Sequence, residues 1–341
     1  MRSVLSYCNS ILTSYTDYCL SIGGFLSFPD ANIFSTASDG INLYAVGTTT
    51  NASSDPYYGR LYKVALSGSG APTAVSATAT LPSYAGTGVA ISGANALVTY
   101  GTSTNVAMMG GLASFNLSTL AQVNNQTLFD ARDVMVDPAN SARAFVVTGA
   151  TSVSSLGKTI EYSSDASGSA IRSITSGGNA IAESRSTILV GNQLMISTAG
   201  DAGFSVMCKA TGAILATKGA PVVAGIASTN TVTNGVAAVP GYLLVANGEA
   251  GVYVYQFSKT NLLSSNLCNG VSLTLLGRLS LAASGTYVNA ELSANSIHAV
   301  NVLSILNVVT SRLLVIASGN KGISLLNVTD ISLPLGGVDD F

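Results

Sequence analysis

The sequence predicts an all-β fold in which one four-stranded unit is repeated six times. Six glycines each introduce a short apolar segment of β type, and they are Gly59, Gly111, Gly157, Gly203, Gly251 and Gly322. The spacings between them are 52, 46, 46, 48 and 71 residues. A period of about 40 to 50 residues is typical of a supersecondary unit that buries its apolar face only against its neighbours.

Two strand-like runs precede each of these glycines, with Gly, Asn, Asp and Pro between them, as in antiparallel meanders. In chain order they are residues 32–35 and 42–47, 88–92 and 96–101, 134–136 and 144–149, 187–190 and 194–197, 236–239 and 242–246, and 299–302 and 313–317. A fourth run follows the glycine strand, as at residues 121–128. Four strands per unit and six units describe a β-propeller, which closes radially and so avoids long exposed edges.

The two ends of the chain suggest how this ring closes. The last unit has no clear fourth strand after Val328, whereas a spare strand, residues 24–28, precedes the first unit. We therefore expect residues 22–341 to form a single propeller domain closed by an N-terminal strand, with residues 1–21 as an N-terminal extension. The interval of 71 residues is then one blade with a long loop. A ring of seven blades is the alternative.

Two strand–turn–strand passages carry a family resemblance. They read Leu244-Val-Ala-Asn-Gly-Glu-Ala-Gly-Val-Tyr-Val-Tyr and Leu314-Val-Ile-Ala-Ser-Gly-Asn-Lys-Gly-Ile-Ser-Leu-Leu-Asn-Val-Thr-Asp. Both resemble the LVIVD-type propeller repeats of secreted and cell-surface proteins, while the other four units match only in part. The resemblance implies an extracellular display scaffold, and it supplies no catalytic residue.

The composition limits the partners. Charged residues are 9% of the chain and the net charge is -2, against roughly a quarter charged in an ordinary soluble domain. With no basic run, we expect neither nucleic acid nor an anionic membrane surface as a partner. The most apolar stretch, residues 297–318, contains His298 and Arg312 and is rich in β-branched residues, which predicts two strands and no membrane insertion. So few charges favour assembly with copies of itself or other surface proteins, or a coat of glycans.

Cysteines and glycosylation acceptor sites favour an extracellular location. We expect the disulfides Cys8–Cys19 and Cys208–Cys268, with four free thiols as the alternative. The Asn-x-Ser/Thr acceptor sites are Asn51, Asn116, Asn125 and Asn327. Residues 1–24 do not form a secretory signal, so export requires that Met1 is not the true start or that the chain is processed.

Candidate catalytic groups are few. The one histidine, His298, is the only base that a Ser-His-Asp triad could use, and a lone strand histidine is typical of a hydrogen-bonded core or channel residue. Among the expected starts of the innermost strands, Asp133, Glu183 and Asn234 offer oxygen ligands suited to calcium. Arg132 and Arg185 stand beside two of them, and structural ion pairs would give the same pattern.

Two glycine-rich pieces and the tyrosines have simpler interpretations. The pieces 200–203 and 248–251 lack the lysine and the helix of a phosphate loop, which predicts hairpin turns. Seven tyrosines are candidates for a sugar-binding surface, although strand tyrosines usually pack between blades; they are Tyr57, Tyr58, Tyr84, Tyr100, Tyr253, Tyr255 and Tyr287.

The leading hypothesis is a non-enzymatic, extracellular structural or adhesive β-propeller glycoprotein, without a cofactor, that forms part of a repeated surface or filament assembly. The alternative is a propeller hydrolase or lactonase with calcium in its central channel. A third reading is an intracellular protein-interaction ring.

Overall fold

The computed structural model describes residues 26, 28, 30–49, 58–67, 72–101, 110–149, 157–175, 185–261, 263–279, 293–303, 309–317 and 323–327. These residues form strands β1 to β23 and two 3-10 turns, η1 (Ser228–Asn230) and η2 (Leu267–Asn269). The all-β prediction is therefore confirmed for this part of the chain. Within it, no helix has the length and apolar character needed to cross a membrane.

The strands follow the order expected from the repeat. The first three sheets are β1 (Ala31–Ser38), β2 (Asn42–Thr49), β3 (Gly59–Leu66) and β4 (Pro72–Thr80); β5 (Ala85–Ser92), β6 (Asn95–Gly101), β7 (Gly110–Asn116) and β8 (Gln122–Leu128); and β9 (Ala131–Val136), β10 (Arg143–Thr148), β11 (Lys158–Ser163) and β12 (Arg172–Thr175). The next three are β13 (Thr187–Val190), β14 (Leu194–Thr198), β15 (Phe204–Cys208) and β16 (Ile214–Lys218); β17 (Gly235–Val239), β18 (Tyr242–Ala246), β19 (Val252–Lys259) and β20 (Val271–Leu279); and β21 (Ser296–Leu303), β22 (Val309–Ala317) and β23 (Ile323–Asn327).

Each sheet is an antiparallel meander of strands consecutive in sequence. Among the described residues, five sheets have four strands and the sixth, β21–β22–β23, has three. Five of the six glycines lie at or beside the start of a third strand, as Gly59 does in β3, and the sixth, Gly322, lies outside the described residues. The apolar stretch 297–318 contributes two strands, β21 and β22, paired antiparallel, which confirms the prediction of two strands there.

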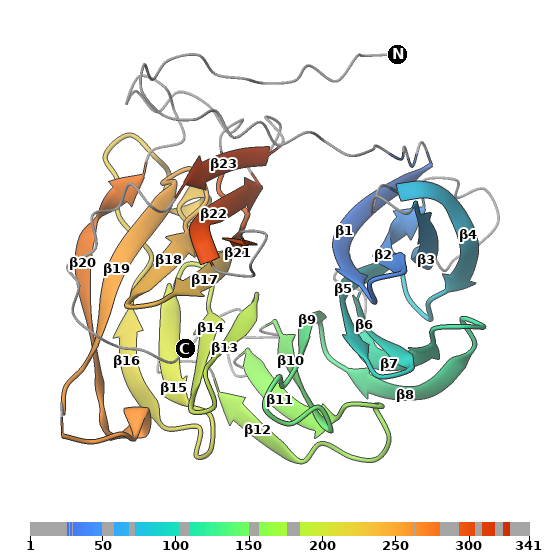
Figure 1. Cartoon of the computed structure of the whole chain (residues 1–341), viewed down its shortest axis with the longest axis horizontal. Helices are drawn as coiled ribbons and strands as arrows, with labels where there is room; N and C mark the ends of the chain where they lie inside the picture. The colour runs from blue at the N-terminus through green and yellow to red at the C-terminus, as the bar shows by residue number, and fades with distance from the viewer. Residues whose placement is uncertain are drawn as a thin grey trace.

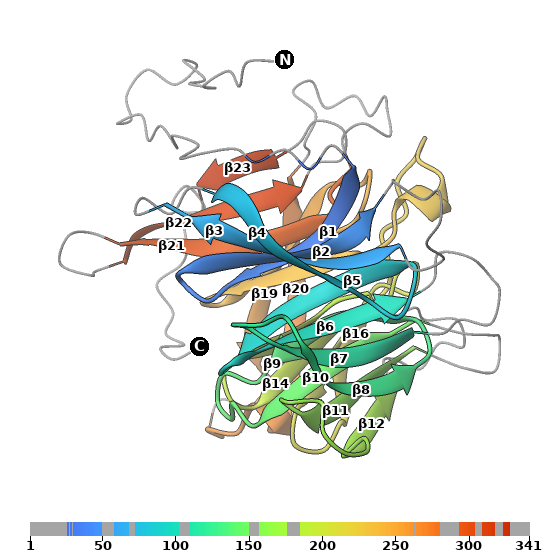
Figure 2. The same cartoon turned by 90° about the vertical axis from the view of Figure 1, so that its right-hand side faces the viewer.

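The sheets follow one another around a common centre in chain order (Figure 1). Their first strands lie innermost: β1 contacts β5, β5 contacts β9, β9 contacts β13, β13 contacts β17, and β17 contacts β21. Figure 2 shows the neighbouring sheets β1–β4 and β5–β8 from the side. This arrangement brings the starts of the first strands together, where candidate site residues were expected.

The core is divided into clusters that lie between consecutive sheets. Five clusters of buried apolar side chains fill the five junctions from the first sheet to the sixth in the described part of the chain. In β6, Ala96 and Val98 face the first sheet while Leu97 faces the third. Successive side chains of a strand point to opposite faces. The second strands are therefore almost wholly apolar because both of their faces are buried.

The N-terminal segment that was expected to close the ring is only partly described. Residues 1–21, and with them the predicted disulfide Cys8–Cys19, lie outside the described residues. Of the spare strand, Leu26 and Phe28 are described, and the Phe28 ring packs edge-on against Tyr62 of β3 with ring centroids 5.2 Å apart.

Candidate functional site

The structure places the described candidate residues at the inner strands, as expected. Asp133 lies in β9, Asn234 immediately before β17, and His298 in β21. Glu183 lies outside the described residues. The three described candidates thus belong to three different sheets, and the contacts of each one decide what it can do.

Asp133 joins the third sheet to the fourth. Its carboxylate accepts hydrogen bonds from the Ser186 hydroxyl and the Thr187 backbone amide, and its Oδ1 accepts one from the Val134 amide at 2.9 Å. Desolvation outweighs these hydrogen bonds and raises the pKa of the Asp133 carboxyl to about 6. A carboxyl group with a pKa of about 6 is suited either to structural hydrogen bonding between blades or to proton transfer near neutral pH.

Small residues make room for this carboxyl. A Cβ atom on Gly88 of β5 would lie 2.9 Å from Asp133 Cα and 3.1 Å from its Oδ1. Next to it, the Thr87 hydroxyl donates to the Ala131 carbonyl oxygen at 2.7 Å. The second sheet therefore packs closely on the inner strand of the third, and Asp133 lies where three sheets meet.

Asn234 makes the corresponding contact between the fourth and fifth sheets. Arg185 Nη1 donates to Asn234 Oδ1 at 2.8 Å, and the Thr198 hydroxyl donates to the Asn234 carbonyl oxygen at 3.4 Å. A divalent cation bound by Oδ1 would have to displace the positively charged donor. The structure therefore gives this oxygen a partner that competes with calcium.

Because Glu183 lies outside the described residues, only part of the predicted calcium set can be placed. No group of three or more His, Cys, Asp or Glu side chains lies close enough together in that part of the chain to hold a metal ion. Arg132 pairs with Asp130, with Nη2 to Oδ2 at 2.6 Å, and not with its neighbour Asp133 as the sequence interpretation implied. Calcium at Asp133, Glu183 and Asn234 stays a prediction that metal analysis can test.

His298 has a simple environment. Its side chain is exposed, and Nε2 lies 3.3 Å from Ser296 Oγ two residues earlier on the same strand. The exposed side chain contradicts the expectation of a core residue, and the expectation of a channel residue stays a prediction.

The two glycine-rich pieces are hairpin turns, as predicted, and they also connect blades. Gly200 and Gly248 have φ of +59° and +55°, a region that favours glycine. Gly200 forms a β-bridge with Thr233, and Gly248 forms one with Ala294, each just before the first strand of the next sheet. These bridges were not predicted from the sequence, because the residues that pair with the glycines, Thr233 and Ala294, are of different types.

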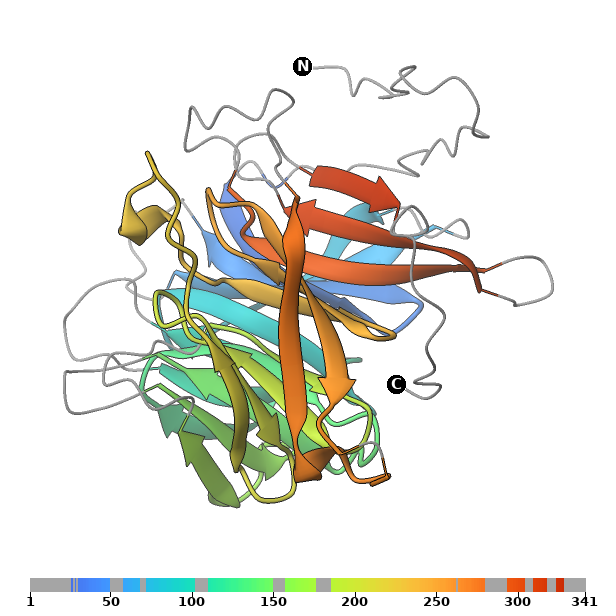
Figure 3. The same ribbon diagram turned by 90° about the vertical axis from the view of Figure 1, so that its left-hand side faces the viewer.

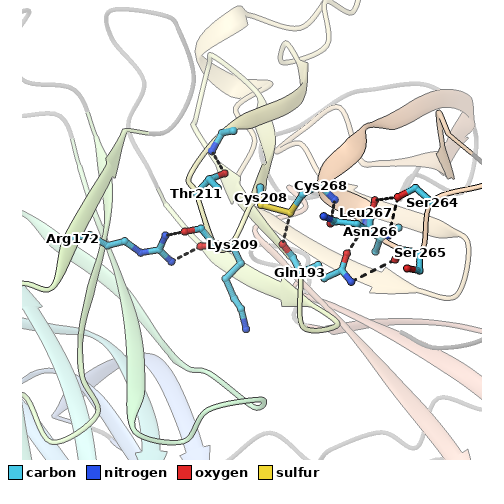
Figure 4. The surroundings of a disulfide bond; sticks show 12 residues. Arg172, Gln193, Cys208, Lys209, Thr211, Ser264, Ser265, Asn266, Leu267 and Cys268 are labelled. Atoms are coloured by element: carbon cyan, nitrogen blue, oxygen red, sulfur yellow. Dashed lines mark hydrogen bonds between the residues drawn. A yellow bond between two sulfur atoms is a disulfide. The ribbon is translucent and has the colours of Figure 1, made fainter.

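The predicted disulfide Cys208–Cys268 is present, with Cα atoms 5.1 Å apart (Figure 4). It ties the end of β15 to η2 and so joins the fourth and fifth sheets. Gln193 holds the same loop, since its Oε1 accepts a hydrogen bond from the Leu267 amide. The fourth and fifth sheets are therefore joined by a covalent link in addition to their packing.

Ion pairs extend that link to the third sheet. Lys209 Nζ lies 2.9 Å from Asp137 Oδ2, and only 3% of Asp137 is exposed. Arg172 pairs with Glu161 and donates to the backbone oxygens of Lys209 and Ala210. These ion pairs were not predicted from the sequence, since the third and fourth sheets that they join come from separate repeats.

The tyrosines divide into two groups. Tyr100 and Tyr255 are 3% and 6% exposed and pack between sheets, as strand tyrosines were expected to do. Tyr58 and Tyr84 stack at 5.5 Å, and 39% of Tyr84 is exposed. Tyr57 and Tyr287 lie outside the described residues.

Comparison with known proteins identifies the fold alone. No family model and no curated protein matches the sequence. The hydrazine synthase of Kuenenia stuttgartiensis has a TM-score of 0.57 at 15% identity over 86% of this chain and 83% of that one. The β-propeller domain of Cps50 (Swd1) from Myceliophteria thermophila gives 0.53 at 12% over 87% and 88%, and the Dos1 propeller gives 0.54 at 13% over 89% and 68%. The chain is thus similar in fold to β-propellers.

Proposed function

We propose that the protein is an extracellular β-propeller that serves as a structural or adhesive building block in a repeated surface or filament assembly. In this proposal its six sheets are the blades of one ring, closed by an N-terminal strand, with repeats of the LVIVD type. Its partners are copies of itself or other surface proteins.

The disulfide Cys208–Cys268 carries the extracellular part of the proposal. Disulfides persist in oxidising compartments and are rare in the cytosol. This bond closes a sequence separation of 60 residues and joins two neighbouring sheets, so it is placed to stabilise the packing between blades.

Two acceptor asparagines have geometries compatible with glycans. Asn125 is exposed in β8, and the Tyr100 hydroxyl donates to its Oδ1 at 2.5 Å. Asn116 Oδ1 accepts from the Ser118 amide at 3.0 Å. Both bonds use the carbonyl oxygen, whereas an N-linked sugar attaches to Nδ2. Asn51 lies outside the described residues, as does the side chain of Asn327.

Exposed apolar side chains support the assembly part. Val222 and Leu263 are 99% and 100% exposed, and Leu275 and Leu276 on the outer strand β20 are 50% and 51% exposed. With charged residues at only 9% of the chain, little electrostatic repulsion opposes contact between copies. An apolar outer strand with few charges favours pairing with another chain.

Intact-mass measurement of the protein from its native source tests the proposal. We expect the mass to rise by two hydrogen atoms per disulfide on reduction and to fall on enzymatic removal of N-linked sugars. Sedimentation at high concentration should show assemblies. An unmodified, fully reduced mass together with monomers at every concentration would contradict the proposal.

A further inference from the structure

Two exposed apolar loops lie at opposite ends of the fifth sheet. The entry loop, residues 219–227, leads from β16 through η1 into β17, and the η2 loop, residues 260–270, of which Leu262 is not described, leads from β19 to β20. Both β17 and β19 pair antiparallel with β18, so they run in the same direction. The loop that enters β17 therefore lies at one end of the sheet and the loop that leaves β19 at the other (Figure 3, with η1 in gold and η2 in orange).

The entry loop is apolar over its whole length. Its sequence, Gly219-Ala-Pro-Val-Val-Ala-Gly-Ile-Ala, contains no charged or polar side chain. Val222 is 99% exposed, and Val223 and Ile226 are half-buried. The Ile226 amide donates to the Val223 carbonyl oxygen at 3.1 Å, which folds this part of the loop into a turn. Neighbouring apolar side chains at a surface are typical of a site where another protein binds.

The η2 loop presents one leucine from a backbone that is held in place. Leu263 is 100% exposed, whereas Leu267 is 8% exposed and packs in the cluster between the fourth and fifth sheets. Asn261 Oδ1 accepts a hydrogen bond from the Leu263 amide at 3.1 Å. Ser264 Oγ accepts one from the side-chain amide of Asn269 at 2.7 Å. These bonds fix the loop around an apolar side chain that lies in solvent.

A covalent bond also fixes the η2 loop. The disulfide Cys208–Cys268 ties it to β15, and Gln193 Nε2 donates to the Ser265 carbonyl oxygen at 3.5 Å. A loop that is ordered before it binds loses less conformational entropy on binding, and the contacts of its exposed side chains then give more affinity. The η2 loop is therefore suited to bind an apolar surface through Leu263.

We propose that the η2 loop of one copy of this chain binds the entry loop of the next copy, with Leu263 packed against Val222 and Ile226. The inference rests on the assembly proposed above and names the surfaces through which it forms. The two loops lie at opposite ends of one sheet, so they can meet only between chains. Each pair of copies keeps one unused loop of each kind, and a head-to-tail contact of this type forms a filament unless it closes into a ring.

The charges near the loops favour the head-to-tail arrangement. Neither loop contains a charged residue. At the η1 end, Asp201 and Glu249 lie in the two turns beside the entry loop, and Lys218 precedes that loop. At the η2 end, Lys259 precedes the η2 loop. Contact between two η2 loops would bring two Lys259 ammonium groups together, whereas the head-to-tail contact brings Lys259 toward an end with two carboxylates and one ammonium group.

Sedimentation velocity of single variants tests whether these loops carry the assembly. Leu263→Asp and Val222→Asp each place a carboxylate in the proposed contact. The control is Ile41→Asp, because Ile41 is 75% exposed between β1 and β2, away from both loops. We expect the first two variants to raise the concentration at which half of the protein is assembled by about tenfold or more, and the control to behave like the wild type.

Cysteine cross-linking between two variants tests the orientation. Val222→Cys is mixed with Leu263→Cys, and the control mixture is Val222→Cys with Ile41→Cys. After mild oxidation, peptide mapping without reduction identifies the linked residues. We expect a 222–263 link between chains and no 222–41 link in the control. A 263–263 link in place of the 222–263 link, or equal linking in both mixtures, would overturn the proposal.

The outcomes separate this contact from the proposed function. Assembly that Leu263→Asp and Val222→Asp leave unchanged would overturn the contact, while the proposed assembly would stand. A wild type that stays monomeric at every concentration would overturn both.

Discussion

Replacement of Gly248 by alanine tests whether the turns between second and third strands hold the blades together. Gly248 has φ of +55°, and a Cβ atom there would lie 2.2 Å from the Asn230 carbonyl oxygen. The left-handed conformation alone costs an alanine about 1 to 2 kcal/mol. To relieve the contact, the Asn230 carbonyl or the turn must move by about 1 Å, since ordinary van der Waals contact of a Cβ atom begins at 3.4 Å.

That movement breaks specific hydrogen bonds. The Glu249 amide donates to Asn230 O at 2.8 Å, and Gly248 exchanges bonds of 3.1 and 2.8 Å with Ala294. At about 1 kcal/mol for each of these three bonds, added to the conformational cost, we expect Gly248→Ala to lower the free energy of unfolding by about 4 to 5 kcal/mol. The control is Gly241→Ala, because Gly241 also has positive φ, +77°, but nothing lies within 4 Å of its Cβ position.

Urea unfolding, followed by circular dichroism, measures the difference in the free energy of unfolding between the two variants. The comparison uses variants whose unfolding free energy depends equally steeply on urea concentration. We expect Gly241→Ala to lose only the conformational part, about 1 to 2 kcal/mol, and Gly248→Ala to lose clearly more. Equal losses in the two variants would refute the reasoning that this turn connects neighbouring blades.

Three further changes test the contacts between the third, fourth and fifth sheets. Folding raises the pKa of Asp133 from 3.8 to about 6, so the contribution of this carboxyl to stability is complete below about pH 4 and is lost as the pH rises through 6. In urea titrations, the free energy of unfolding of the wild type relative to Asp133→Asn should fall by at most about 3 kcal/mol between pH 4 and 7. Parallel pH profiles of the two proteins would contradict this. Replacing Cys208 and Cys268 together by serine should cost about 4 kcal/mol in the chain-entropy account of the loop of 60 residues, and an unchanged denaturation midpoint would contradict it. Lys209→Met leaves the buried Asp137 carboxylate without its cation, and thermal unfolding should show a loss of about 3 kcal/mol; a loss within error of zero would count against a structural ion pair.

The repeat made much of the fold predictable from sequence. Each third strand begins near a glycine, and each second strand is a continuous apolar run, because its two faces pack against different neighbours, as Leu97 and Val98 do. Such patterns recur at every blade and depend only on local sequence. The inner positions of Asp133 and Asn234 followed from the same alignment of repeats.

Contacts between repeats were not predictable in the same way. Asp137 and Lys209 are 72 residues apart, and nothing in either local sequence indicates the pair. Arg132 pairs with Asp130 rather than the adjacent Asp133, since side chains two residues apart in an extended segment share a side while neighbours do not. The partners of Asp133 depend on how the fourth sheet packs on the third, which no periodicity specifies.

Electron cryomicroscopy of the protein isolated from its native source tests the central claim most directly. We expect wheels of six four-stranded blades, each closed by an N-terminal strand, with repeated contacts between wheels. An open arc of sheets, a seventh blade, or isolated particles without contacts at high concentration would contradict it.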